Sequence, residues 1–129
     1  MEKFRVLVVD DEEDFLETIV NRLRRRNVDA EGVNNGKKAL ELLEHRDFDV
    51  VILDVKMPGM DGLEALKEMK SRKPFMEVIM LTGHGSVESG IQGMRLGAFD
   101  YIMKPADIDD LMEKMRQAYE RKQLQQGRP

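Results

Sequence analysis

The sequence has no cysteine, only two histidines and no long apolar run. Without cysteine there can be no disulfide, thiol catalysis, zinc finger or iron–sulfur cluster, and two histidines are too few for a zinc catalytic site. No apolar run approaches the roughly 20 residues that a membrane-spanning helix requires. Five consecutive acidic residues, 10–14, interrupt the first apolar run. We therefore expect no signal peptide, no membrane contact and a cytoplasmic location.

The sequence also lacks a large excess of charge of one sign. It contains 21 Lys and Arg residues and 25 Asp and Glu residues, so its net charge is −4. This mildly acidic balance gives no general reason to expect that the chain contacts nucleic acid. The phosphate-cradling patterns GxGxxG and GxxxxGK[ST] are missing, which disfavours a nucleotide-binding module. With 129 residues, 41% hydrophobic and 36% charged, the composition is typical of one globular domain and not of a disordered chain.

The chain does contain short apolar runs that alternate with longer helical patterns. Four runs are nearly continuous and a fifth is weaker; in chain order they cover residues 4–9, 29–33 (the weaker run), 49–53, 78–81 and 99–103. Near-continuous apolar strands are typical of a parallel sheet that helices cover on both faces.

The segments between these runs have apolar residues at helical spacing. In the first of them Phe15, Ile19 and Leu23 share one face, and Asp11 is placed to cap the start of the helix. Five strands alternating with five helices predict an α/β fold. We expect a doubly wound parallel sheet, in which the first and third strands are neighbours if the strand order is 2-1-3-4-5.

Polar residues of chemically useful types follow four of the apolar runs. They are Asp10 with Asp11, then Asp54, Thr82 and Lys104. Ligands of open α/β sheets bind at the carboxyl ends of the strands, so these side chains are expected to share one pocket. A single Asp after a strand often only caps a helix or forms a turn, but the whole set favours a functional site. Three carboxylates in one pocket repel each other, and Mg²⁺ (or Mn²⁺) is the type of cation that fits them best.

The segments VLVVDDEEDF, VVILDVKMPGMDGLE, VIMLTGHG and AFDYIMKP resemble the receiver (CheY-like) domain of bacterial two-component response regulators. The resemblance covers about residues 4 to 122, and the motifs occur in the family's order. It implies a single flavodoxin-like doubly wound (βα)5 receiver domain over residues 1–122, with a five-stranded parallel sheet of order 2-1-3-4-5. Residues 123–129 are expected to form a polar tail or the start of a linker. The resemblance further implies that Asp54 accepts a phosphoryl group from a sensor histidine kinase or phosphotransfer protein in a Mg²⁺-dependent phosphorelay.

By the same resemblance, Asp11, Asp54 and the backbone carbonyl of Lys56 are ligands of the metal, and Asp10 holds a water molecule bound to it. Lys104 is expected to pair with Asp54 at rest and with a phosphoryl oxygen after transfer. A carboxylate is a competent nucleophile once a neighbouring cation manages its charge, so the chemistry of the residues agrees.

The resemblance also implies a switch. Thr82 donates its hydroxyl to the phosphoryl group, and Tyr101 turns inward. These two changes reshape the surface formed by the helix around Ile91, the strand at 99–103 and the helix after Asp107. We expect that surface to control a partner or output domain, or to form a homodimer. Independently of the switch, the resemblance implies a cis peptide bond between Lys104 and Pro105, which turns the lysine into the pocket.

Two alternatives remain open from the residues. A Mg²⁺-dependent aspartyl-phosphate phosphohydrolase places its nucleophile after the first strand and a catalytic acid two positions later, an arrangement that Asp10 and Glu12 would match. We expect no enzymatic activity beyond self-catalysed phosphotransfer and autodephosphorylation, because no segment of the sequence forms a substrate cap.

The two glycines of the fourth helix, Gly90 and Gly93, also allow two interpretations. They indicate either tight packing on the sheet or a helix soft enough to reorganise.

Overall fold

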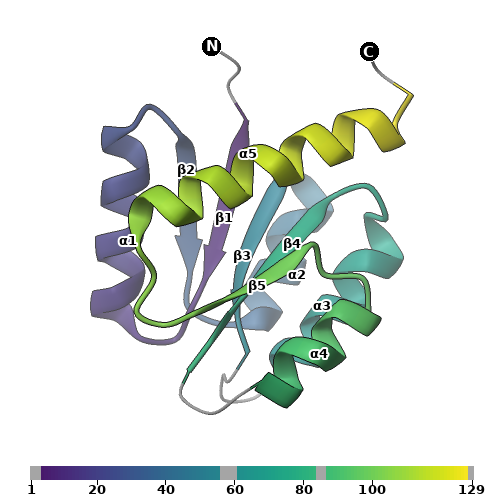
Figure 1. The fold of residues 1–129 in the computed structure, drawn as a ribbon, viewed down its shortest axis with the longest axis horizontal. Coiled ribbons are helices and arrows are strands. Elements are labelled where there is room, and N and C mark those ends of the chain that lie inside the picture. Colours follow the sequence, from purple (N-terminus) through teal and green to yellow (C-terminus); the bar gives the residue numbers. More distant parts are fainter. Residues whose placement is uncertain (1–3, 56–60, 84–86, 128–129) are drawn as a thin grey trace.

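Strands and helices alternate along the whole chain (Figure 1). The computed structural model describes residues 4–55, 61–83 and 87–127. In chain order the elements are β1 (Arg5–Val9), α1 (Glu13–Arg25), β2 (Asp29–Val33), α2 (Gly36–His45), β3 (Val50–Asp54), α3 (Gly62–Arg72), β4 (Glu77–Thr82), α4 (Val87–Arg95), β5 (Asp100–Met103) and α5 (Ile108–Gln125). Each strand begins and ends within one residue of the apolar run that predicts it.

The five strands form one parallel sheet of order β2-β1-β3-β4-β5, which confirms the predicted topology. Val9 at the end of β1 lies opposite Leu53 in β3, and Thr82 at the end of β4 lies opposite Met103 in β5. The carboxyl ends of these four strands therefore meet along one edge of the sheet.

Helices cover both faces of the sheet (Figure 1). Alternate residues of β3 belong to two separate cores: Val51 and Leu53 lie in the core beneath α2, α3 and α4, while Val50 and Ile52 lie in the core beneath α1 and α5. Because β3 is buried on both sides, its sequence is apolar throughout and not alternating. No helix in the described part of the chain is long and apolar enough to span a bilayer.

The helix starts correct one prediction. Asp11 does not cap α1; Glu12 occupies the N-cap position, and it forms no capping hydrogen bond with its side chain. Asp11 lies one residue too early for this role, and its carboxylate belongs to the acidic group at the sheet edge. In α5, Asp107 is the N-cap, and its carboxylate accepts hydrogen bonds from the backbone N–H groups of Asp109 and Asp110 at 2.8 and 3.3 Å.

The two glycines of α4 lie against side chains of the sheet. A methyl group on Gly90 would lie 2.9 Å from the ring of Tyr101, and one on Gly93 would lie 2.0 Å from the sulfur of Met80. Both distances are shorter than van der Waals contact, so the structure supports the packing explanation for these glycines.

Candidate functional site

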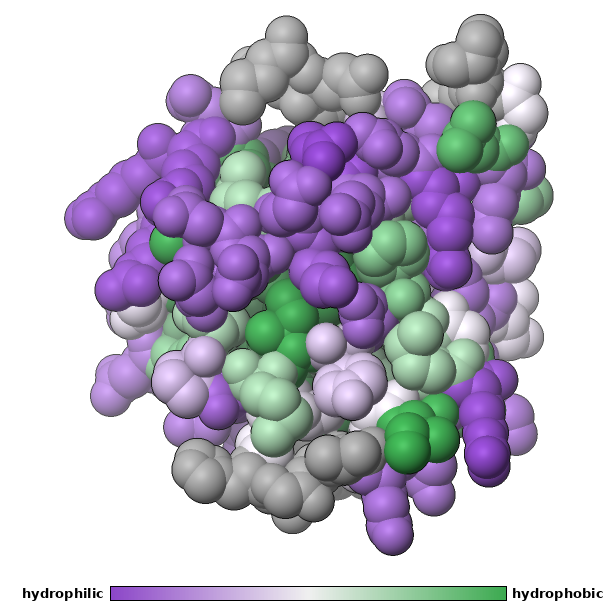
Figure 2. All heavy atoms as spheres, in the orientation of Figure 1, coloured by the Kyte–Doolittle hydropathy of each residue, from purple (hydrophilic) through white to green (hydrophobic). Residues whose placement is uncertain are grey.

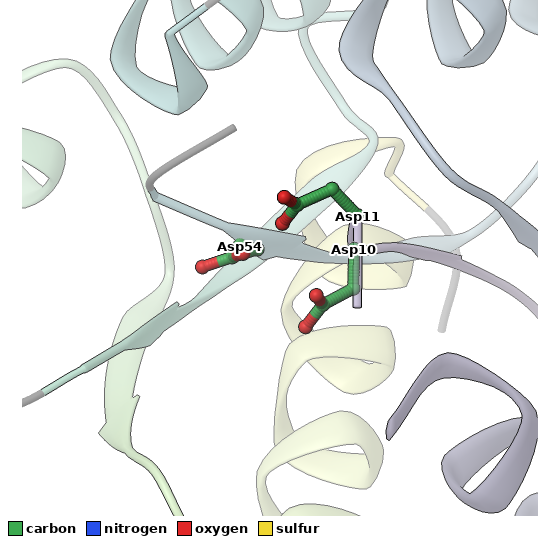
Figure 3. A group of neighbouring side chains, drawn as sticks. All are labelled: Asp10, Asp11 and Asp54. Atoms are coloured by element: carbon green, nitrogen blue, oxygen red, sulfur yellow. The ribbon is translucent and has the colours of Figure 1, made fainter. Parts of the chain in front are cut away.

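Three carboxylates meet at the carboxyl ends of β1 and β3. Asp10 and Asp11 follow β1, Asp54 is the last residue of β3, and each contributes one oxygen to a group within 4.8 Å of one another (Figure 3). Asp10 and Asp54 are buried, whereas Asp11 reaches solvent. The parallel pairing of Val9 with Leu53 brings the residues that follow them to the same level, so backbone register alone creates this acidic group.

Lys104 supplies the positive charge of the site. Its ammonium nitrogen lies 2.8 Å from Asp10 Oδ2, 3.1 Å from Glu12 Oε1 and 3.7 Å from Asp54 Oδ2. The nitrogen also lies 4.6 Å from the centre of the Phe15 ring, close enough for a cation–π interaction. Lys104 therefore neutralises several carboxylates together, with Asp10 nearest. The Lys104–Pro105 peptide bond is cis.

The surroundings of Lys104 also shift its pKa. Burial by itself lowers the pKa of the ammonium group, but the carboxylates of Asp10, Asp54 and Glu12 outweigh burial and raise the pKa above its usual value. Lys104 is consequently held in its charged form at the edge of the pocket.

The described residues fit a hard divalent cation. The donors are carboxylate oxygens, which such ions prefer, and they carry more negative charge than Lys104 alone compensates. Asp10 Oδ2 is buried without a hydrogen bond of ordinary geometry, although the Lys104 ammonium lies 2.8 Å away. Such an acidic group is typical of the Mg²⁺ site of receiver domains. Lys56, the other expected ligand, lies outside the described residues.

Thr82 and Tyr101 lie on the strands beside the pocket. Thr82 is buried at the end of β4, and its hydroxyl donates a hydrogen bond to the sulfur of Met103 at 2.9 Å. Tyr101, in β5, is half-buried, and its ring packs over Gly90 of α4. Sequence reasoning placed Thr82 at this edge of the sheet, but the acceptor for its hydroxyl was not foreseen, since Met103 reads as an ordinary apolar strand residue.

Glu12 is a second residue whose place in the site was missed. The sequence gives Glu12 a role only as a possible acid in the phosphohydrolase alternative, whereas in the structure its carboxylate pairs with Lys104. The sequence does contain a signal for this role, because Glu12 directly follows Asp11 in the acidic run and must lie near a positively charged group in the pocket.

Comparison with known proteins agrees with this fold. The family model of the response regulator receiver domain matches residues 6–116 of the chain. The chain therefore belongs to the receiver (CheY-like) domain family of two-component signalling, in which such domains are generally not enzymes.

Two curated relatives are longer than this chain. Regulatory protein AtoC of Escherichia coli (strain K12) is 40% identical over 107 residues, which are 83% of this chain and 23% of the relative. The DNA-binding transcriptional regulator NtrC of the same organism is 36% identical over 126 residues, which are 98% of this chain and 27% of the relative. The chain thus spans about a quarter of the length of these proteins.

Solved structures of single receiver domains resemble the chain over nearly its whole length. The receiver domain of the Francisella response regulator 1452 has a TM-score of 0.84 and 32% identity, and the match covers 92% of this chain and 98% of that one. A receiver domain protein (CheY-like) from Methanospirillum hungatei JF-1 has a TM-score of 0.90 and 30% identity, and the match covers 96% of this chain and 99% of that one.

Proposed function

We propose that this receiver domain is a phosphorylation-controlled switch in which Asp54 accepts a phosphoryl group from a sensor histidine kinase or phosphotransfer protein. The observation that carries the proposal is the position of Asp54 at the end of a central strand. It is buried, it shares the acidic group with Asp10 and Asp11, and the Lys104 ammonium lies 3.7 Å away. A carboxylate in this setting is a nucleophile whose charge is held in check by cations.

In the transfer step, a carboxylate oxygen of Asp54 forms a bond to phosphorus. The bond between phosphorus and the imidazole nitrogen of the donor breaks, and the electron pair leaves with that nitrogen. Lys104 stabilises the negative charge spread over the phosphoryl oxygens, because its ammonium group is already beside Asp54.

Mg²⁺ (or Mn²⁺) bound at this site would neutralise the charge that Asp54 and the phosphoryl group bring together. Asp11, Asp54 and the backbone carbonyl of Lys56 are the proposed ligands, and Asp10 is proposed to act through a water molecule. Asp11 is the member of the acidic group that reaches solvent, so an ion can enter the pocket from its side.

The output of the switch is proposed to be the face formed by α4, β5 and α5. After transfer, the Thr82 hydroxyl turns to the phosphoryl group and Tyr101 moves with it. Figure 2 shows apolar residues at the surface of this face. Ile91, Met94 and Met103 are 46%, 43% and 40% exposed, which suits a surface that binds a partner or a second copy of the chain. Since NtrC is a DNA-binding transcriptional regulator, an output domain that controls transcription is the partner we favour.

The domain itself is proposed to occupy residues 1–122, with residues 123–129 forming a polar tail or the start of a linker; α5 continues through the first part of that segment, to Gln125.

The test is the intact mass of the protein after incubation with Mg²⁺ and acetyl phosphate. Wild type is expected to gain one phosphoryl group, and both Asp54→Asn and wild type with chelator are expected to gain none. Asp110→Asn, an exposed aspartate on α5, serves as the matched control and should still be modified. An adduct that persists in Asp54→Asn would show that another residue is the acceptor.

A further inference from the structure

We propose that Met103 is a positioning residue for the switch. Its sulfur holds the hydroxyl of Thr82 toward β5 in the unmodified protein, and it thereby sets how readily that hydroxyl turns to a phosphoryl group on Asp54. This inference rests on the proposed function of Asp54 as the phosphoryl acceptor.

The contact joins two residues that the sheet places directly opposite each other. Thr82 pairs with Met103 in the register of β4 and β5, and the Thr82 hydroxyl donates to the Met103 sulfur at 2.9 Å. The backbone around the contact is fixed independently, because the N–H of Lys104 donates to the carbonyl of Thr82 at 2.8 Å. The position of the hydroxyl is therefore a matter of side-chain rotation.

The strand order shows that the Thr82 hydroxyl points away from Asp54. β4 lies between β3, which carries Asp54, and β5, which carries Met103. Asp54 is paired with Leu81, one residue before Thr82. A hydroxyl that donates to Met103 consequently points to the side of β4 opposite Asp54. Rotation about the Cα–Cβ bond of Thr82 into another staggered position would release it from β5.

The chemistry of the acceptor suits a reversible restraint. The Thr82 side chain is fully buried, so its hydroxyl costs free energy if it lacks a partner. A thioether is a weak acceptor, whereas a phosphoryl oxygen is charged and forms a stronger hydrogen bond. In the unmodified protein the Met103 sulfur accepts the hydrogen bond of the Thr82 hydroxyl. When Asp54 carries a phosphoryl group, the hydroxyl donates to a phosphoryl oxygen instead.

Packing does not explain the sulfur at this position. Met103 is 40% exposed at the end of the edge strand, where a leucine of similar volume would cover the same surface. The property that leucine lacks is the acceptor atom.

The test compares variants that differ mainly in acceptor strength at residue 103. Met103→Leu removes the acceptor, and Met103→Gln replaces it with a stronger amide oxygen. The measured quantity is the affinity of each protein for beryllofluoride with Mg²⁺, a stable mimic of the phosphoryl group, followed by NMR. We expect Met103→Leu to bind about threefold more tightly than wild type and Met103→Gln about threefold more weakly.

Two controls separate positioning from a structural effect. In a Thr82→Val background, both substitutions at residue 103 should leave the affinity unchanged, because the hydroxyl they act through is gone. Met112→Leu, a half-buried methionine on α5, should match wild type.

The outcomes also separate this inference from the proposed function. Equal affinities for wild type, Met103→Leu and Met103→Gln would overturn the role of Met103, as would the same differences in the Thr82→Val background. If wild type binds no beryllofluoride and gains no phosphoryl group, then the proposed function itself fails, and the role of Met103 fails with it.

Discussion

Glu77 is a buried carboxylate at the opposite end of the strands from the acidic group. It begins β4, and its side chain is fully buried. Its carboxylate accepts hydrogen bonds from the Nε–H and a terminal N–H of Arg121 in α5. The Lys70 ammonium, from α3, lies 3.6 Å away. Arg121 also lies over the Phe99 ring, 4.8 Å from its centre. One carboxylate thus ties two helices on opposite faces of the sheet to the start of a strand.

Replacing Glu77 with Gln should lower the free energy of unfolding by about 2 kcal/mol, because Arg121 and Lys70 would lose the buried charge that compensates them. The exposed pair of Arg116 with Glu120 provides the control, and Glu120→Gln should change stability by less than about 0.5 kcal/mol. Urea denaturation of both variants measures the difference. Equal losses would mean that Glu77 contributes no more than a surface ion pair.

Lys70 should titrate at a lower pH than an ordinary lysine. Burial is the main cause, and it lowers the pKa of the Lys70 ammonium although Glu77 acts in the opposite direction. Between the folded and the unfolded pKa, the unfolded chain binds more protons, so the free energy of unfolding attributable to Lys70 rises with pH across that interval. NMR titration of the Lys70 side chain, folded and in urea, checks the sign. A folded pKa at or above the value in urea would contradict it.

At the scale of elements, α4 packs so closely on the sheet that its two glycines leave no room for a larger residue. Gly93 touches Met80 in the core, and Gly90 touches Tyr101 on the edge strand β5. These contacts place the Tyr101 ring directly on the backbone of the helix, so any movement of the ring is coupled to α4. The helix is held by close approach and not by the helix propensity of its residues.

We expect Gly93→Ala to destabilise the protein by about 1–3 kcal/mol, because Met80 is fully buried and must leave its position. Gly90→Ala should displace the Tyr101 ring, which NMR shifts of that ring would report. Gly83→Ala is the matched control, since a methyl group there meets nothing within 4 Å. Wild-type stability in Gly93→Ala would contradict the close contact with Met80.

The sequence predicts every strand of this fold, the strand order and the edge at which the acidic residues meet. The strands follow from burial patterns, and the shared edge follows from the alignment of strand ends in a parallel sheet. The strand order follows from the resemblance to receiver domains, and the structure confirms it. The contacts between individual side chains are harder to predict from the sequence. Glu77 and Arg121 are 44 residues apart, and neither lies in a recognisable motif. The Thr82 contact depends on a rotamer, which no periodicity encodes.

For the whole molecule, the acidic group is a source of repulsion that folding must overcome. Mg²⁺ should therefore raise the melting temperature, and at ten times its Kd it should stabilise the folded state by about 1.4 kcal/mol. Chelator should reverse the effect. Asp11→Asn should reduce the gain, while NaCl at matched ionic strength should not reproduce it. An equal gain in wild type and Asp11→Asn would show that the ion binds elsewhere.

Both ends of the described chain lie away from the pocket (Figure 1). β1 begins at the amino edge of the sheet, and the last turns of α5 are tied to that edge by the pair of Lys122 with Asp49, at 2.7 Å. A fluorescent label, an affinity tag or a solid support joined near either end would therefore sit at the back of the molecule. The domain can be immobilised in this way for kinetic measurements while the pocket stays open to solution.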